Sequence, residues 1–236
     1  MPSTTGSSGS SVSRRRRDGG PALSRPKLLV VVQRYGDGVA GGAETHAREL
    51  TKRLHPHLDV EVLTTAAADY RTWENAFTAG IEWVDDVPVR RFPVLRQRAY
   101  DFKLYERRAF AKAHTLEDER TFVDQQGPYA PDLLEHLWRV GRDADHVLFF
   151  TYIYYPTVRG LPLVPERAVF VPTAHDEPAL GLSIYDPVFH APRAIAFNTA
   201  EERALVHGRF HNERVPNGIF GVGVDVPAER EAARFR

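Results

Sequence analysis

The sequence predicts an α/β fold in which a parallel sheet carries helices on both faces. The first observation is the order of elements near the start, where the apolar run Leu28–Val32 leads into a glycine-rich loop and then into a helix-patterned segment. The second is that short apolar runs of strand length alternate with helical patterns along the chain, which is typical of βαβ units. The later apolar runs begin at Val60, His146, Val169 and Ala194.

The loop after the first strand points to a phosphate-bearing ligand. Glycines let a backbone turn tightly and approach a ligand closely, and the free N–H groups at the start of the following helix form a partly positive pocket. The helix is predicted by a stripe of small and apolar residues with an acidic residue in its first turn. The loop glycines are Gly36, Gly38, Gly41 and Gly42; the stripe is Ala43, Ala47, Leu50 and Leu54, and the acidic residue is Glu44.

The same glycines leave two other interpretations open. Gly36, Gly38 and Gly41 match the G-x-G-x-x-G pattern of dinucleotide-binding enzymes. That pattern requires an acidic residue at the carboxyl end of the second strand, where it holds the ribose. Here the second strand, Val60–Thr64, ends in threonines, and Asp59 lies at its start, on the wrong edge of the sheet. An NAD(P)-binding oxidoreductase is therefore a weaker alternative, and a loop that only turns the chain is another.

The middle of the chain is predicted to form a loop, a hairpin and a long helix. The loop, residues 66–77, is polar and aromatic, and strands at Ile81–Trp83 and Val87–Val94 pair around an Asp85–Asp86 turn. The segment Leu95–His114 has a helical pattern and many basic residues, a combination suited to an anionic membrane surface. Because acidic residues interrupt the basic run, a solvated face over a core stripe is the favoured interpretation, and peripheral membrane contact is the alternative.

Three patterns are assigned structural roles. Pro131 opens a helix that ends at Gly141 as its C-cap. Asp143 and Asp145 match a metal-binding D-x-D pair, but they precede the strand His146–Phe150, whereas ligands gather at the carboxyl ends of strands, so we expect no metal. The third pattern is a capping box that starts a later helix, formed by Thr199 and Glu202.

Candidate functional residues follow the strands. Tyr152 leaves the strand His146–Phe150 at the ligand-binding edge, where an aromatic ring offers a flat apolar surface for a sugar; packing in the core is an equal alternative for this tyrosine. His175 ends the run from Val169, beside Asp176, and is placed to hydrogen-bond a sugar hydroxyl or a proton in transfer. His46, on the helix after the glycines, has no such placement and is interpreted as structural.

Four segments, in order, resemble the N-terminal domain of family 4 glycosyltransferases, which have the GT-B fold. They are Gly41-Gly42-Ala43-Glu44 with its helix, the strand ending in His175-Asp176, the strand and capped helix of residues 194–202, and Gly221-Val222-Gly223-Val224-Asp225. The resemblance covers residues 27–226. It implies one Rossmann-like half of a retaining, metal-independent hexosyltransferase of glycan biosynthesis that uses a nucleotide sugar as co-substrate and no other cofactor.

The resemblance also implies site residues. His175 is the expected catalytic residue, with the donor sugar as its partner, and Gly41, Gly42 and Asp176 are expected to bind the donor diphosphate and sugar. The acceptor-binding candidates are Arg34, Tyr35, Trp73 and Tyr152. The expected acceptor is a carbohydrate or lipid-linked hydroxyl compound.

The domain organisation leaves most of the donor site outside this chain. Residues 1–26 form a basic tail predicted to be disordered, residues 27–226 the acceptor-side domain, and residues 227–236 the start of a linker. The family's second domain carries a Glu-x7-Glu element, and Glu74 and Glu82 match that spacing by coincidence. We therefore expect activity only with a C-terminal donor-binding domain, in cis or in trans. The alternative is a non-catalytic sugar-binding, glycolipid-binding or interaction domain.

Composition limits the classes of partner and location. The 236 residues include no cysteine, which excludes disulfides and thiolate chemistry, and their formal net charge is zero, so bulk charge implies no nucleic-acid partner. A secretory signal needs an apolar core of about 7 to 15 residues, longer than the run Leu28–Val32, and no segment reaches the length of a membrane span. We expect a cytoplasmic protein.

Overall fold

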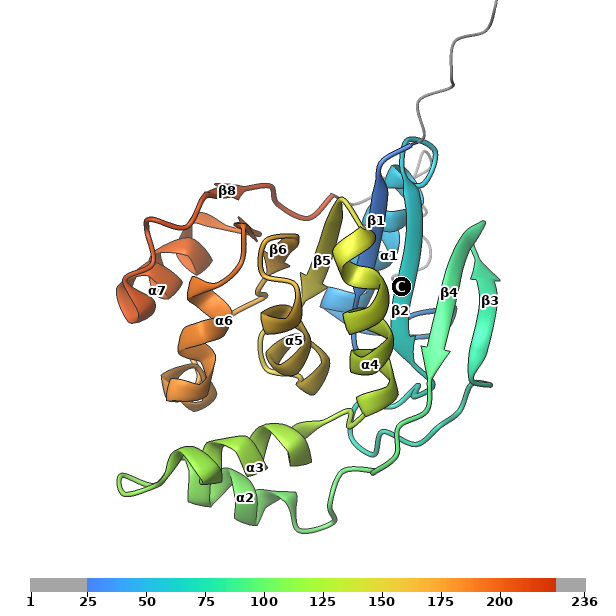
Figure 1. Ribbon diagram of the computed structural model, residues 1–236. Helices are drawn as coiled ribbons and strands as arrows, with labels where there is room; N and C mark the ends of the chain where they lie inside the picture. Colours follow the sequence, from blue (N-terminus) through green and yellow to red (C-terminus); the bar gives the residue numbers. More distant parts are fainter. Residues whose placement is uncertain (1–24, 224–236) are drawn as a thin grey trace, which may run out of the picture.

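The computed structural model describes residues 25–223, and its centre is an eight-stranded, mostly parallel sheet (Figure 1). The strand order is β3-β4-β2-β1-β5-β6-β7-β8, in which β3 runs antiparallel to β4 and the other neighbours are parallel. The Rossmann-like α/β fold predicted from the sequence is therefore confirmed. The predicted tail up to residue 24 and the predicted linker at 227–236 lie outside the described residues.

The strands and helices have the following bounds. The strands are β1 (Lys27–Val31), β2 (Asp59–Thr65), β3 (Gly80–Val84), β4 (Val87–Phe92), β5 (His146–Phe150), β6 (Ala168–Val171), β7 (Ala194–Phe197) and β8 (Asn217–Ile219). The helices are α1 (Gly42–Leu54), α2 (Phe102–Ala109), α3 (Leu116–Gln126), α4 (Pro131–Val140), α5 (Tyr155–Gly160), α6 (Asp186–His190) and α7 (Ala200–Phe210). Short 3₁₀ helices occupy Gly141–Asp143, Leu161–Leu163, Pro178–Gly181 and Ser183–Tyr185.

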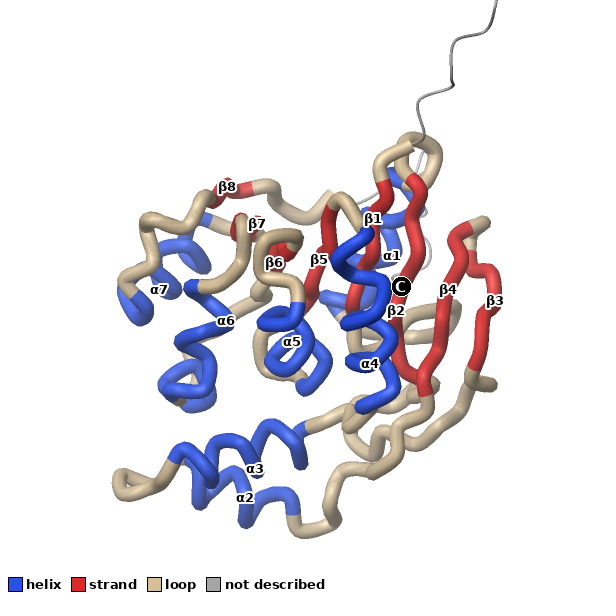
Figure 2. The backbone as a smooth tube through the Cα atoms, in the orientation of Figure 1, coloured by secondary structure: helices blue, strands red, loops and turns tan. Residues whose placement is uncertain are grey.

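Helices cover both faces of the sheet, but unequally. α4, α5 and α6 lie in front of the sheet and α1 lies behind it (Figures 1 and 2). In front, strand residues such as Leu29 and Phe149 join Leu133 of α4 in the larger apolar core. Behind, Val30 of β1 packs with Ala47 of α1 in a second core. Beside α1, an apolar groove of about 700 Å³ extends over the back of β5 to β8.

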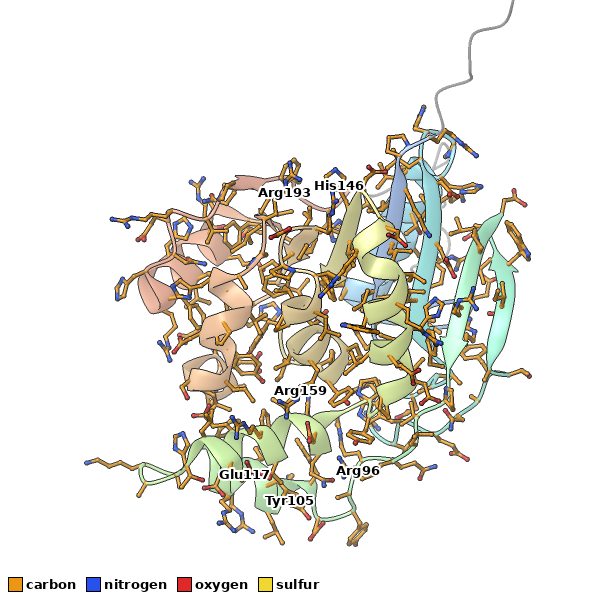
Figure 3. The ribbon with its side chains drawn as sticks, in the orientation of Figure 1. Arg96, Tyr105, Glu117, His146, Arg159 and Arg193 are labelled. Atoms are coloured by element: carbon orange, nitrogen blue, oxygen red, sulfur yellow. The ribbon has the colours of Figure 1, made fainter. Side chains whose placement is uncertain are left out.

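The carboxyl ends of the parallel strands meet at one edge of the sheet, where ligands bind in folds of this type. α2 and α3 lie across the same end of the molecule (Figure 1). His146, the first residue of β5, marks the opposite, amino edge, and Arg96 lies at the carboxyl end (Figure 3). Within residues 25–223, no helix combines the length and apolar character needed to cross a bilayer.

The predicted hairpin is confirmed, and its turn explains the two aspartates. β3 and β4 pair antiparallel, and Val84 is opposite Val87, which leaves Asp85 and Asp86 as a two-residue turn. Both have positive φ, at 50° and 62°. This geometry suits a two-residue hairpin, and aspartate tolerates it better than most residues do.

The prediction of one helix over Leu95–His114 is wrong at both ends. α2 spans only Phe102–Ala109. The preceding residues are held in extended backbone, because Leu95 donates its N–H to the carbonyl of Tyr129 at 2.9 Å. The next helix, α3, was not predicted, although Thr115 and Asp118 form a complete capping box in front of it.

The structure gives a different physical reason for two of the structural roles assigned from the sequence, those of Gly141 and Asp145. Pro131 begins α4 as predicted, but Gly141 has φ −69° and the chain continues into a 3₁₀ turn. A Cβ at Gly141 would lie 2.8 Å from Val164, so close packing rather than a left-handed cap requires glycine there. Asp145 accepts the N–H of Lys27 at 2.7 Å, which joins the starts of β1 and β5.

Candidate functional site

A cavity of about 660 Å³ opens at the carboxyl edge of the sheet, beside the start of α1. Four segments of the chain supply its walls: the start of α1, the loop after β6, the loop after β7 with the start of α7, and the segment after β8. Its lining residues are Gly42, Ala43, His46, Thr173, Ala174, His175, Asp176, Asn198, Thr199, Glu201, Glu202, Leu205 and Val222. The structure thus brings the predicted Gly42, His175 and Asp176 to one cavity.

The two predicted donor-site glycines differ in what the fold requires of them. A Cβ at Gly41 would lie 2.1 Å from a carboxylate oxygen of Glu44 and 3.1 Å from the guanidinium of Arg34, so internal packing excludes a side chain there. A Cβ at Gly42 would meet no atom within 4 Å, and its φ is not positive. Neither packing nor backbone strain explains glycine at position 42, and its open space faces the cavity.

A buried ion pair fixes the start of α1. Arg34 donates from Nε to Glu44 at 2.9 Å, and Gln33 donates to the same carboxylate oxygen at 2.9 Å. The other Arg34 nitrogens donate to the backbone carbonyls of Ala40 and Ala68, at 3.1 and 2.7 Å. Because all three guanidinium nitrogens of Arg34 are bonded, the guanidinium sets the path of the glycine loop.

The loop after β6 is held by a carboxylate from α7. Glu202 accepts the N–H of Ala174 at 2.8 Å with one oxygen and the N–H of Asn198 at 2.7 Å with the other. Thr199 caps α7 by accepting the N–H of Glu202 at 3.0 Å, as the predicted capping box requires. In a complete capping box the Glu202 carboxylate would also accept the N–H of Thr199. Here it accepts the N–H groups of Ala174 and Asn198 instead.

Backbone strain accompanies these loops. Thr151 after β5 and Thr173 after β6 have positive φ, at 67° and 49°. A left-handed conformation is unfavourable for a β-branched residue and is commonly found near functional sites. The two hydroxyls lie 3.1 Å apart, with Thr173 donating. This bond joins the two loops that leave adjacent strands.

His175 and Asp176 are exposed at the cavity. Neither side chain makes a hydrogen bond or ion pair with any residue in the range 25–223. Their polar atoms are therefore free to bind a ligand, and Glu202 fixes the backbone immediately before them.

His46 belongs to this cavity, although the sequence interpretation made it structural. It lies one helical turn after Gly42, so both residues share a face of α1. Its Nδ1 is buried without a hydrogen-bond partner, and its ring contacts Phe150 edge-on, with centroids 5.4 Å apart. Burial lowers the pKa of the His46 imidazole, so the ring is neutral near pH 7. The sequence contained a signal for this placement, because His46 lies four residues after Gly42 and residues i and i+4 share a helix face.

The structure places the four predicted acceptor-binding residues inside the protein. Arg34 is held by Glu44, and Tyr35 shares a 2.6 Å hydrogen bond with Thr51. The Trp73 indole donates to the carbonyl of Gln126 at 2.7 Å, and the Tyr152 hydroxyl donates to Glu177 at 2.6 Å. Burial and the bond to Glu177 raise the pKa of Tyr152 well above its usual range. The structure does not bring these side chains to the cavity, and their role in acceptor binding stays a prediction.

Candidate ligands for a metal are not clustered. Among residues 25–223, no group of three or more histidine or acidic side chains is arranged to hold a metal ion. The charged groups at the cavity are Asp176, Glu201 and Glu202, of which Glu202 is committed to backbone bonds.

The chain has structural similarity to solved proteins. No protein-family model matches the chain, and no curated protein matches it. The chain is similar in structure to the α,α-trehalose 6-phosphate synthase of Burkholderia multivorans, with a TM-score of 0.48 and 12% sequence identity. The match covers 81% of this chain and 43% of the synthase, so the chain spans less than half the length of that enzyme.

Proposed function

We propose that this chain is the acceptor-side half of a GT-B-type glycosyltransferase of glycan biosynthesis, a retaining, metal-independent hexosyltransferase. It would transfer a sugar from a nucleotide sugar to a hydroxyl of a carbohydrate or lipid-linked acceptor. Its activity would require a C-terminal donor-binding domain, and its place would be the cytoplasm. The observation that carries the proposal is the convergence of Gly42, His175 and Asp176 on one cavity at the carboxyl edge of a Rossmann-like sheet.

The cavity offers groups suited to the leaving diphosphate. The backbone N–H groups in the first turn of α1 have no helical acceptor and carry the positive end of the helix dipole. Gly42 leaves room for a phosphate to approach them. Preorganised N–H donors of this kind stabilise developing negative charge, by about 3 to 4 kcal/mol for one donor in a dry site.

The proposed reaction exchanges one bond at the anomeric carbon for another. The bond from that carbon to the diphosphate oxygen breaks, and its electron pair stays on the diphosphate. The acceptor hydroxyl oxygen forms the new glycosidic bond, and its proton passes to the departing diphosphate. His175 would hydrogen-bond a hydroxyl of the donor sugar and fix the orientation of the sugar, which is a positioning effect on the transition state.

One wall is not sufficient for this chemistry. Gly42 and His175 lie at an open edge, and transfer requires groups from both sides of a cleft that excludes water. Gly41, Gly42 and Asp176 would contact the donor, and the remaining donor contacts would come from the second domain.

The test compares the chain alone with the chain joined to a C-terminal donor-binding domain. Each form is first checked for a cooperative melt and is then assayed with a panel of nucleotide sugars and acceptors. Transfer by the joined form and none by the chain alone would support the proposal. Robust transfer by the chain alone would overturn the half-enzyme interpretation.

A non-catalytic sugar-binding domain is the second candidate. It is favoured by the same open edge, because a single wall can bind a sugar without turning it over. Sugar binding by the chain, with no transfer in the joined form, would select it.

An NAD(P)-binding domain fits the loop less well, because β2 ends in Thr64 and Thr65 without a carboxylate. Enhanced nicotinamide fluorescence on mixing would support that alternative instead.

A further inference from the structure

Arg98 is a half-buried cation in the loop between β4 and α2. Its guanidinium donates to the carbonyl of Gln126 at 3.0 Å and lies 5.4 Å from the ring centre of Trp73 and 4.9 Å from that of Phe102. Its backbone N–H donates to the carbonyl of Thr72 at 3.0 Å. The loop after β2, through Thr72, and the last residue of α3, Gln126, therefore fix Arg98 in place.

The charge of Arg98 is not balanced by an ion pair. Its Nε is buried without a partner, and no carboxylate in residues 25–223 lies within ion-pair distance of it. Burial lowers the pKa of Arg98, and Asp69 and Glu106 act on it only at longer range. Among the described residues, five other partly or fully buried arginines have a carboxylate partner, in the pairs Arg34–Glu44, Arg48–Asp85, Arg90–Glu61, Arg91–Glu82 and Arg159–Asp124, whereas Arg203 and Arg209 of α7 do not.

Two tyrosines lie within electrostatic range of Arg98, namely Tyr70 and Tyr154. Tyr154 packs edge-on against Trp73, with ring centroids 5.3 Å apart. Its hydroxyl makes no hydrogen bond to any residue in the described part of the chain, and burial raises its pKa, so it stays protonated and can donate. Tyr70 is 45% exposed and lies under the Arg34 guanidinium.

These residues come from loops at the carboxyl edge of the sheet, and the strand before Tyr154 borders the reversal point of the sheet. Tyr70, Arg98 and Tyr154 follow β2, β4 and β5, and the strand order changes direction between β1 and β5. Open α/β sheets bind ligands at that point, outside the carboxyl ends of the strands. Glu44 in the first turn of α1 also acts on the pKa of Tyr154, although none of the three residues lines the cavity at Gly42.

We propose that Arg98, with Tyr154 and Tyr70, forms a subsite for an oxyanion, a phosphate ester or carboxylate, carried by the acceptor. The subsite rests on the proposed function in that its ligand is the acceptor of the same reaction. A guanidinium presents parallel N–H donors that match the oxygens of phosphate and carboxylate, and a half-buried one gains more from such a bond than an exposed one. The tyrosine hydroxyls supply neutral donors beside it.

The test measures equilibrium binding by the full chain of four probes: inorganic phosphate, a hexose 6-phosphate, a hexuronate and the unmodified hexose. The variants are Arg98→Gln and Arg98→Lys. Arg96→Gln is the matched control, because Arg96 lies in the same loop (Figure 3), stacks on Tyr129 and donates to the backbone carbonyl of Asp124, but is exposed.

We expect Arg98→Gln to weaken binding of the hexose 6-phosphate or the hexuronate by about ten-fold or more, with Arg98→Lys intermediate and Arg96→Gln unchanged. Which anionic probe loses more affinity identifies the anion as phosphate or carboxylate. Binding of the unmodified hexose should not change.

Equal loss in Arg96→Gln and Arg98→Gln would overturn the subsite, as would unchanged binding of both anionic probes in Arg98→Gln. The proposed function is tested separately, by nucleotide-sugar transfer in the joined form. Transfer that is insensitive to Arg98→Gln and uses a neutral acceptor would remove the subsite and leave the glycosyltransferase. Arg98-dependent anion binding without any transfer would retain the subsite and overturn the proposed glycosyltransferase function.

Discussion

Glu202 in the first turn of α7 accepts the backbone N–H of Ala174, at 2.8 Å, one residue before His175. The other carboxylate oxygen accepts the N–H of Asn198 at 2.7 Å. One buried side chain therefore positions both loops that face α1 across the cavity. Because both oxygens accept from backbone donors, the site depends on a residue that need not touch the ligand.

Glu202→Gln is expected to destabilise the fold by about 1 to 3 kcal/mol, because the amide can satisfy only one of the two buried N–H donors. The measurement is the free energy of unfolding in denaturant. Glu201→Gln is the control, since Glu201 is adjacent and exposed, bonds neither Ala174 nor Asn198, and among the described residues interacts only with the neighbouring Thr199 side chain and its own backbone. Equal stability of the two variants would contradict this role for Glu202.

His175→Ala is expected to lower turnover of the joined enzyme by about ten-fold or more while changing stability little. The side chain is exposed and makes no hydrogen bond within residues 25–223, so its removal leaves no buried group unpaired. Turnover is measured at saturating donor, beside a thermal melt. His57→Ala, at an exposed histidine near the start of β2, is the control. Unchanged turnover would remove His175 from the site.

Gly42→Val is expected to weaken donor diphosphate binding by about ten-fold or more, with little change in acceptor binding or melting temperature. Nothing within 4 Å meets a Cβ at Gly42, so the fold should accept the side chain, whereas a phosphate approaching the first turn of α1 should not. Gly208→Val is the matched control, because Gly208 is also helical, exposed and free of neighbours within 4 Å. If Gly42→Val folds and binds the donor with unchanged affinity, the glycine loop only turns the chain.

The fold and one side of the site follow from local sequence signals. Gly42 follows the loop after the first predicted strand, and His175 ends a later one; because the carboxyl ends of parallel strands share an edge, their convergence was predictable. His46 was predictable in principle, because it lies four residues after Gly42 on the same helix. It was missed because its ring also contacts the core residue Phe150, which is what a structural histidine does.

The burial of Trp73 and Tyr152 could not be predicted, because both residues are bonded over long separations in sequence. Trp73 reaches the carbonyl of Gln126, 53 residues away, and Tyr152 reaches Glu177, 25 residues away. In the folded chain these hydrogen bonds satisfy polar groups whose partners cannot be read from the sequence. Arg98 was hidden for the opposite reason: it lies in a basic run that predicted one helix, and its lack of a carboxylate partner is visible only in three dimensions.

The attachment of α3 to the rest of the domain is expected to depend on pH through His114 and Glu119. The His114 ring lies 2.8 Å from Glu119 through Nε2 and 2.6 Å from the carbonyl of Ala111 through Nδ1. Both contacts need an N–H, so the charged ring fits best, and the Ala111 carbonyl and Glu119 raise the pKa of His114. Glu119 also accepts the N–H of Ile184 at 2.7 Å and the hydroxyl of Ser183 at 2.9 Å.

The two groups limit the stable range from opposite sides. Burial acts to raise the pKa of Glu119, but the hydrogen bonds from His114, Ile184 and Ser183 outweigh it, and the pKa is lowered. A lowered carboxyl pKa contributes stability that is complete above the unfolded value of about 4.3 and is lost as pH falls through the folded pKa. The raised pKa of His114 contributes stability that is complete below about 6.5 and is lost as pH rises through its folded value.

The contact between α3 and Ser183–Tyr185 should therefore be strongest between about pH 4.5 and 6.5 and should weaken above that range. The measurement is amide hydrogen exchange of α3 and of Ile184 at several pH values, corrected for the intrinsic exchange rate. In His114→Gln the loss of protection above pH 6.5 should disappear, because glutamine does not titrate. If the wild type and His114→Gln lose protection equally as pH rises, the His114–Glu119 pair does not hold α3 in place.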